Sequence, residues 1–302
     1  MKCLLLLLLL GSVPGETDLA RAGKPKTVSF TMKYTVETGG KTGHLTLTSI
    51  VPMNRPGRQE VVALTCSPEA SEIFEKDGDR FARFEVADPG SRFEITIRVK
   101  MKLQLVDFQT ARKQRKKNRK KIKAAAAEET LKKHLLPEKF IETKDPRILA
   151  LARKARARGE ARKVRKIHDL VLKRFGPASY RGEDRGAAAS VESKKVDCRD
   201  YADIFVALCR ASGLPARYVE GFTIPYSGGP EYAWTEVFLA KYGWVTFDPM
   251  LVEFGSASFE ALRNEYVLLT RHRCSTVLKG EHYYHTEYGG ESMRVALDVH
   301  VP

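Results

Sequence analysis

The stretch that most constrains the fold is a helix pattern followed by three strand patterns, between residues 197 and 249. Asp197 can cap a helix, and apolar side chains then recur at three- and four-residue steps at Tyr201, Ile204, Phe205, Leu208 and Cys209. Gly213-Leu214-Pro215 predicts the end of this helix. Strands are predicted at 215–222, 232–238 and 244–248. Antiparallel strands packed on this helix would form an α+β unit and bring positions 232 and 248 close to residue 198.

Cys198 would enter the first turn of that helix, where the positive end of the helix dipole favours a thiolate. A cysteine in the middle of an apolar helix is normally an inert core residue, and this interpretation suits Cys209. It suits Cys198 poorly, because the neighbours of Cys198 are charged: Lys194, Lys195, Asp197, Arg199 and Asp200. Cys198 is therefore the candidate nucleophile, and such a thiol needs a base beside it and an acid that orients the base.

Four motifs follow one another around Cys198. They are Cys-x-Asp-Tyr-Ala at 198–202, Ala-Leu-Cys-Arg-Ala-Ser-Gly-Leu-Pro-Ala-Arg-Tyr-Val-Glu-Gly-Phe at 207–222, x-Ala-Trp-x-Glu-Val at 232–237 and Gly-Trp-Val-x-Phe-Asp-Pro at 243–249. In this order they resemble the bacterial transglutaminase-like superfamily, closely over about 180–250 and more weakly from Asp145. A β-module followed by such a core also resembles exported members of the superfamily.

The resemblance implies a papain-like α+β core with a Cys-His-Asp triad. Its members perform acyl transfer or hydrolysis at amide bonds, as transglutaminases, peptidases or amidases. Carried over by position, the nucleophile is Cys198 and the acid is Asp248, while Tyr232 stands at the histidine position, directly before Ala233-Trp234. A protein or peptide is the implied substrate or ligand.

Tyr232 divides the functional expectation into two hypotheses. A tyrosine, with a pKa of about 10, stays neutral near pH 7 and cannot supply an imidazolium partner for the thiol. One hypothesis is a thiol peptidase, amidase or acyltransferase that uses Cys198 with a degenerate triad, and whose activity is weak or lost. The alternative is an inactive transglutaminase-like binding or structural protein of the cell envelope.

Several other side chains are candidates near this site. Trp234 and Trp244 could line a substrate cleft, or could be buried tryptophans of the core. His282 and His285 lie in a C-terminal segment that could fold back and supply a base. Strand alternation places Glu231 on the opposite face from Tyr232. No His/Cys group has metal-ligand spacing, so we expect neither a metal nor a cofactor.

The remainder of the chain predicts a β-sandwich module at 27–109, a basic linker or helix at 110–135 and the core domain at 136–302. The alternation of Val28, Phe30, Met32, Tyr34 and Val36 is typical of a half-buried strand, and further short strands follow at the spacing of a small sandwich. Strands over about 267–301 are expected to complete the sheet of the core.

The net charge of +15 comes in large part from Arg112–Lys123, which holds nine Lys or Arg residues and no acid. Its residues favour helix. It could be a solvated connector between domains or a surface that binds an anionic cell-envelope component. Nucleic-acid binding is not expected, because no aromatic residues interleave with the charges.

The N-terminus begins with Met1-Lys2-Cys3, continues with seven leucines and ends in small residues. This is typical of a secretory signal, expected at residues 1–18 and cleaved on export to the periplasm or the extracellular space. No other segment is long and apolar enough to span a membrane. Of the remaining cysteines, Cys66 and Cys274 could form a disulfide, which the sequence leaves open.

Overall fold

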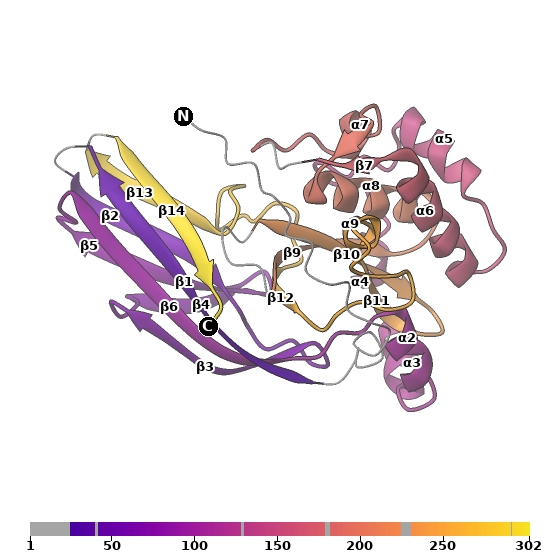
Figure 1. The fold of residues 1–302 in the computed structure, drawn as a ribbon, viewed down its shortest axis with the longest axis horizontal. Coiled ribbons are helices and arrows are strands. Elements are labelled where there is room, and N and C mark those ends of the chain that lie inside the picture. The colour runs from indigo at the N-terminus through magenta and orange to yellow at the C-terminus, as the bar shows by residue number, and fades with distance from the viewer. Residues whose placement is uncertain (1–24, 40–41, 128–129, 179–181, 225–230, 291) are drawn as a thin grey trace.

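The structure is a computed structural model that describes residues 25–39, 42–127, 130–178, 182–224, 231–290 and 292–302. Figure 1 shows two parts side by side, one made of strands and the other of helices packed on a sheet. The expected signal segment at residues 1–18 lies outside the described residues. Within the described ranges, no helix is long and apolar enough to cross a membrane.

The strand part is a sandwich of two antiparallel sheets, ordered β14-β1-β6-β3 and β13-β2-β5-β4. Alternating residues of β1, from Val28 to Val36, are buried between the sheets, because successive side chains of a strand point to opposite faces. The expected β-sandwich is confirmed. Its first six strands are β1 (Lys26–Thr38), β2 (Thr42–Val51), β3 (Gln59–Ser67), β4 (Glu72–Lys76), β5 (Asp79–Ala87) and β6 (Arg92–Leu103).

The C-terminal strands correct one expectation. Residues 267–301 were expected to complete the core sheet, but β13 (Tyr284–Gly290) pairs with β2, and β14 (Met293–His300) pairs with β1. Only β12 (Tyr266–Thr270) joins the core sheet. The alternating pattern showed that these segments are strands with one apolar face, but it carries no information about which sheet the face covers. The chain thus returns to the sandwich after completing the core.

The helical part is the α+β core, which confirms the predicted fold class. Its antiparallel sheet has the order β11-β10-β9-β12, with β9 (Ala216–Thr223), β10 (Tyr232–Leu239) and β11 (Gly243–Phe247). The helix α8 (Cys198–Ala211) packs on β10 and β9. The surrounding helices are α5 (Pro146–Lys154), α6 (Glu160–Arg174), α7 (Ala187–Ser190) and α9 (Pro249–Glu253), and the short strands β7 (Gly176–Pro177) and β8 (Lys195–Val196) precede α8.

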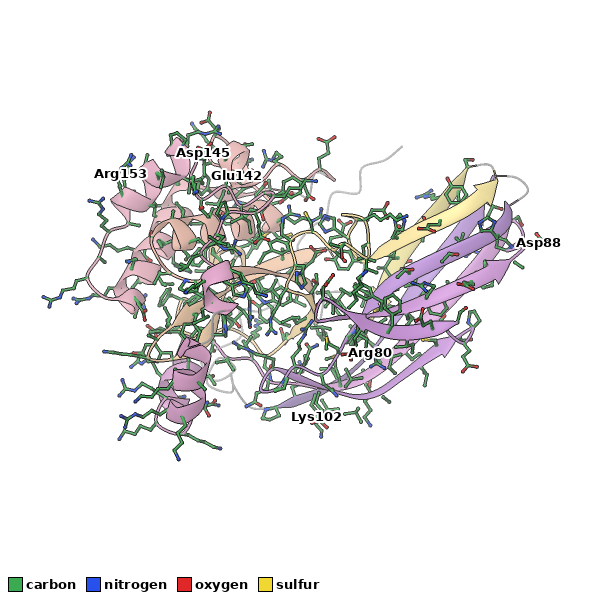
Figure 2. All side chains as sticks on the ribbon, turned by 180° about the vertical axis from the view of Figure 1, so that it is seen from behind. Arg80, Asp88, Lys102, Glu142, Asp145 and Arg153 are labelled. Carbon is green, nitrogen blue, oxygen red and sulfur yellow. The ribbon has the colours of Figure 1, made fainter. Side chains whose placement is uncertain are left out.

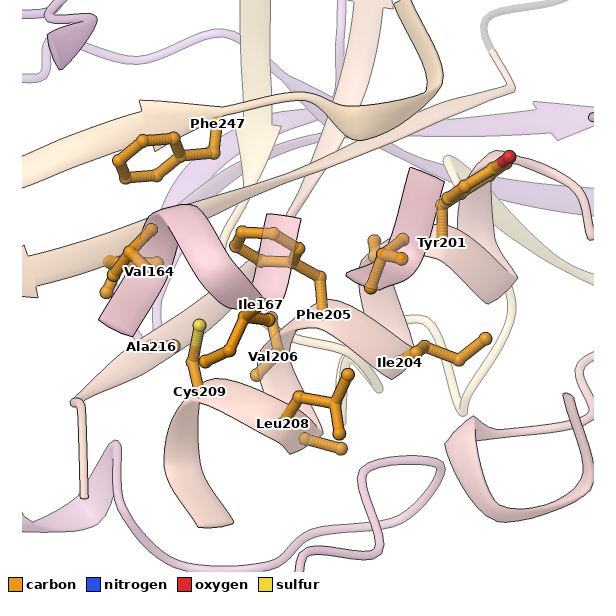
Figure 3. Close-up of a cluster of buried hydrophobic side chains, with 14 of the residues drawn as sticks. Val164, Ile167, Tyr201, Ile204, Phe205, Val206, Leu208, Cys209, Ala216 and Phe247 are labelled. Atoms are coloured by element: carbon orange, nitrogen blue, oxygen red, sulfur yellow. The ribbon is translucent and has the colours of Figure 1, made fainter. Parts of the chain in front are cut away.

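One face of α8 forms the centre of the core (Figure 3). Phe205, Leu208 and Cys209 are completely buried in a cluster that includes Val164 and Ile167 of α6. The thiol of Cys209 therefore sits among apolar side chains, and burial raises its pKa. This confirms the interpretation of Cys209 as a core residue. The predicted stop is also confirmed, because Gly213, with a φ of +75°, directly follows the helix cap and reverses the chain toward β9.

The basic run is helical. It forms α2 (Phe108–Gln114) and α3 (Arg119–Ala127), and α4 (Thr130–Lys133) follows. Phe108 and Ala111 are buried in the core cluster, and Ile122 packs beside Gly243 at the start of β11. Figure 2 shows long nitrogen-tipped side chains projecting from these helices on the other side. The run is thus attached to the core along one face and leaves its charges in solvent.

Among the described residues, the cysteines outside the candidate site are free thiols. Cys66 in β3 and Cys274 after β12 are both half-buried and free. The sequence left their pairing open, and the structure keeps them as two thiols.

Candidate active site

The start of α8 places Cys198 in the first helical turn. Asp197 caps the helix by accepting a 3.0 Å hydrogen bond from the backbone N–H of Asp200. The side chain of Asp200 accepts in return from the backbone N–H of Asp197 at 3.1 Å, which completes a capping box. Ser190 and Arg185 also donate to Asp200. The predicted cap is confirmed, and this network determines the position of the Cys198 backbone.

The Cys198 thiol is buried, with 3% of the residue exposed. Its Sγ lies 3.5 Å from the backbone oxygen of Glu231, to which it donates. Burial raises the thiol pKa to about 12 and the charge of Asp197 adds to this, while the backbone N–H of Ala233 and the Arg199 guanidinium oppose it. Cys198 is therefore a protonated thiol at neutral pH. The helix dipole and the nearby cations do not overcome the cost of burying a thiolate.

Tyr232 begins β10 and is bonded to the candidate acid. Its hydroxyl donates to Oδ2 of Asp248 at 2.8 Å. Burial raises the pKa of the phenol well above its ordinary value, and the negative charge of Asp248 raises it further. The Cys198 thiol lies beside this strand, because it donates to the backbone oxygen of the preceding residue, Glu231. The structure thus brings Cys198, Tyr232 and Asp248 together at one end of the core sheet, with Tyr232 as a neutral hydrogen-bond donor.

Asp248 has a second tyrosine partner, which the sequence analysis missed. Tyr266 of β12 donates to the same Oδ2 at 2.8 Å, and the backbone N–H of Leu251 donates to Oδ1 at 3.1 Å. Burial raises the pKa of Asp248 to about 6 although these donors stabilise the carboxylate. Tyr266 lies 34 positions after Tyr232 in the chain, and no motif marked it. It reaches Asp248 because β12 pairs with β9, opposite Thr223.

The two tryptophans have different positions. Trp234 is 2% exposed and packs on the rings of Tyr232 and Tyr266, with centroid distances of 6.3 and 5.0 Å. Its indole ring therefore contacts both of the tyrosines that donate to Asp248. Trp244 is paired with Phe238 at the far end of β10, six residues from Tyr232 and thus roughly 20 Å along the strand. The expectation that Trp244 lines the same cleft is therefore corrected, because the strand direction carries it away from Cys198.

Neither candidate histidine supplies a base to Cys198. Nδ1 of His282 lies 2.8 Å from Glu220, and Nε2 lies 3.1 Å from Asp184. Burial lowers the pKa of His282, but the two carboxylates outweigh it and raise the pKa to about 9. His282 is therefore an imidazolium with both N–H groups donated, and has no lone pair for a thiol proton. His285 lies in β13, paired with Thr48 of the sandwich.

A cavity of about 550 Å³ adjoins this site. Arg199 and Glu231 of the core line it, together with His282 and Tyr283 of the segment between β12 and β13. Glu231 was predicted to face away from Tyr232, and its side chain lines this cavity whereas Tyr232 faces Asp248. The candidate site is therefore an enclosed thiol and a tyrosine–aspartate pair next to an open cavity.

Comparison with known proteins identifies the core. Residues 149–249 match the model of the transglutaminase-like superfamily. The crystal structure of a proposed cysteine protease from Cytophaga hutchinsonii is similar with a TM-score of 0.60 at 17% identity, covering 92% of this chain and 93% of that one.

Two further similarities are more limited. The periplasmic domain of TgpA from Pseudomonas aeruginosa has a TM-score of 0.40 at 14% identity, covering 80% of this chain and 92% of that one. The uncharacterized protein YebA of Bacillus subtilis is 31% identical over 72 residues, which cover 19% of this chain and 10% of YebA. The chain thus spans about a tenth of the length of that curated relative. Residues 149–249 of this protein thus match a transglutaminase-like domain.

Proposed function

We propose that this protein binds peptide or protein segments at a degenerate transglutaminase-like site, in which Tyr232 occupies the histidine position and thiol catalysis by Cys198 is weak or lost. The observation that carries the proposal is the hydrogen bond from the Tyr232 hydroxyl to Asp248. In a working triad the acid orients a base whose lone pair accepts the thiol proton. Here the acid orients a neutral phenol, whose hydroxyl donates a hydrogen bond to the acid and offers no basic lone pair to the thiol.

The remaining groups do not replace the missing base. Cys198 is buried and protonated, and both nitrogens of His282 face carboxylates. A protonated base would also be needed to donate a proton to the leaving amine, and such general acid–base help contributes about 10²–10⁴-fold to the rate. A site of this kind can still hold an amide-containing ligand, because the surrounding cleft and its hydrogen-bonding groups are independent of the missing imidazole.

The test is the rate of iodoacetamide alkylation of Cys198 against pH, with Cys66, Cys209 and Cys274 resolved by mass spectrometry as internal references. We expect wild-type Cys198 to titrate above the ordinary thiol pKa of about 8.5. In Tyr232→His an imidazole replaces the phenol next to Asp248, and the apparent pKa should fall below about 8. Tyr232→Phe, which removes the hydroxyl and supplies no base, is the matched control and should not lower it.

A double variant and the wild-type value together test whether Cys198 is an activated thiol. Adding Asp248→Asn to Tyr232→His should raise the apparent pKa again, because the imidazole then loses the carboxylate that stabilises its charge. If wild-type Cys198 titrates well below 8, an activated thiol is present and the proposal of lost catalysis is wrong.

The second candidate function is a thiol hydrolase or acyltransferase with an unusual partner for Cys198. It is favoured by one observation, the position of Cys198 at the N-terminus of α8 next to the buried Asp248 site. Amide hydrolysis that Cys198→Ala abolishes would establish this function instead.

We also propose that the protein acts after export and that the α2–α3 surface, defined as the exposed Lys and Arg side chains of residues 112–123, binds an anionic component of the cell envelope. The ion pairs of this surface support the proposal. In the described part of the chain Arg112 pairs with Glu260, and no ion pair joins the other cations of the surface to a carboxylate. The surface is attached to the core through Phe108 and Ile122 and is therefore not a loose tether.

A further inference from the structure

The sandwich is open along one edge, where β13 and β14 lie (Figure 1). Each is the outer strand of a different sheet, so the two do not extend one another. In β14, Val295 and Leu297 are paired opposite Val36 and Tyr34 of β1 and therefore face the interior of the sandwich. The β1 residues are completely buried, whereas Val295 and Leu297 are only half-buried. The apolar interior thus continues to an edge that no described element covers.

The opposite wall of this edge is aromatic. Tyr284 and Tyr288 of β13 pair with Ser49 and Leu45 of β2, whose side chains are buried in the sandwich. The Tyr284 hydroxyl donates across the gap to the backbone oxygen of Val295 at 3.1 Å. Tyr288 is 41% exposed. With the inward residues of β14, these rings line the cavity of about 550 Å³, which has the size of a ligand pocket.

The same cavity reaches the Cys198 site. Its other end is lined by Arg199, Glu231 and Tyr283. The backbone oxygen of Glu231 accepts from the Cys198 thiol, and the Tyr283 hydroxyl accepts from the backbone N–H of Tyr232 at 3.1 Å. An occupant of the apolar edge would therefore lie beside the candidate site. Both parts of the molecule contribute to one binding surface.

The polar end of the cavity is lined by charged side chains of both signs. The charge of Arg199 faces Asp184 at 3.2 Å, and the imidazolium of His282 lies between Asp184 and Glu220. Among the described residues, by contrast, no side chain forms a hydrogen bond or ion pair with the Glu231 carboxylate. Burial raises the pKa of Glu231, although Arg199 and His282 favour its charged form. A cationic group of a ligand would be a suitable partner for this solvent-exposed carboxylate.

We propose that this cavity binds an extended peptide segment, with an apolar side chain between β13 and β14 and a lysine or arginine side chain at Glu231. This inference rests on the proposed function, because it assigns the ligand of the same site. A peptide is favoured over a simple amphiphile because β13 and β14 each have one edge, beside the cavity, that pairs with no described strand, and edge strands offer backbone groups to an extended chain.

The test is fluorescence anisotropy of the full chain with three labelled, end-capped tetrapeptides: Leu-Ser-Leu-Lys, Leu-Ser-Leu-Gln and Ser-Ser-Ser-Lys. We expect the first to bind about tenfold more tightly than either of the others, since each lacks one of the two contacts. In Glu231→Gln the preference for lysine over glutamine should disappear. Glu75→Gln, an exposed glutamate of β4, is the control and should retain the preference.

The apolar contact is tested with Met293→Ala in β14, which lines the cavity. Binding of the two leucine-containing peptides should weaken about tenfold, because several buried methylene equivalents are lost. Ile73→Ala in β4 is a matched control, since Ile73 is 43% exposed at another edge of the sandwich. Equal weakening by Ile73→Ala, or a lysine preference that survives Glu231→Gln, would overturn the inference.

Two comparisons separate this inference from the proposed function. Cleavage of the lysine peptide that depends on Cys198 would refute lost catalysis and leave the cavity assignment standing. An inert thiol together with no binding of any tetrapeptide would refute the cavity assignment alone. Decylamine is a fourth probe. Displacement of the labelled lysine peptide by decylamine at concentrations tenfold below those of the unlabelled peptide would refute a peptide in favour of a single-chain amine.

Discussion

At the scale of single residues, the candidate site is defined by which group receives each proton. Asp248 accepts from two tyrosine hydroxyls, and the cationic His282 donates to two carboxylates. Both arrangements keep protons where they are: the tyrosine hydroxyls stay protonated beside Asp248, and His282 stays an imidazolium between Glu220 and Asp184. Tyr232 therefore has a structural consequence beyond the loss of an imidazole, because its hydroxyl completes a buried hydrogen-bond network in which Asp248 is already satisfied.

His282 predicts a specific dependence of stability on pH. Its pKa in the folded state is about 9, above the ordinary value of 6.5, so the folded state binds its proton more tightly than the unfolded state does. The stabilisation is fully present below pH 6.5 and is lost as the pH rises through 9. The shift corresponds to about 3 kcal/mol as an upper bound.

The measurement is urea unfolding at a series of pH values between 6 and 10. We expect the free energy of unfolding of the wild type to fall across this range, and His282→Gln to be less stable at pH 6 with a flatter profile. His44→Gln, an exposed histidine of β2, is the control and should retain the wild-type profile. An unchanged slope in His282→Gln would show that His282 is not the group responsible.

At the scale of elements, local patterns and long-range pairing have separate roles. The Asp197 cap and the apolar face of α8 were predictable because both depend on residues within a few positions of one another. The alternation of β13 and β14 was equally predictable as strand structure, yet their partners were not. Strand pairing depends on tertiary contacts across more than 200 residues, as between Val36 and Val295, which no local pattern encodes.

The α2–α3 surface gives a prediction at this scale. Replacing Lys113, Lys116, Lys117 and Lys120 with glutamine should lower the salt concentration at which the protein elutes from a phosphate-bearing matrix, because dense exposed charges bind an anionic surface cooperatively. The matched control changes four basic side chains of α5 and α6 to glutamine, namely Arg153, Lys154, Arg162 and Lys166. Figure 2 labels Arg153. Equal losses in the two variants would show that net charge alone drives retention.

At the scale of the whole molecule, the sandwich and the core are joined by buried ion pairs. Glu236 of β10 contacts three arginines: Arg217 of β9 at 2.6 Å, Arg271 after β12 at 3.0 Å and Arg58 at 3.1 Å. Arg58 lies directly before β3 and also donates to the backbone oxygen of Trp244 at 2.6 Å. The attraction of these arginines holds the pKa of the buried Glu236 well below its usual range. One carboxylate thus connects the two parts.

Glu236→Gln should therefore destabilise the protein by about 3–5 kcal/mol, because it leaves several buried guanidinium groups without their counter-charge. The midpoint of thermal unfolding should fall. Glu60→Gln, which changes an exposed glutamate of β3 that pairs with Lys102, should leave the free energy of unfolding within about 0.5 kcal/mol of the wild type. A small effect of Glu236→Gln would mean that solvent or a rearranged partner compensates the arginines.

The sequence by itself determined the elements and the chemistry of the candidate triad positions. Helix capping, apolar periodicity and turn residues act over a few positions, so α8, the strands of the core and the grouping of Cys198, Tyr232 and Asp248 could be predicted. Only the tertiary structure decided the burial of the thiol, the second tyrosine on Asp248, the carboxylates around His282 and the cavity at the edge of the sandwich. The physical reason is that desolvation and hydrogen-bond partners depend on chain segments that meet only on folding.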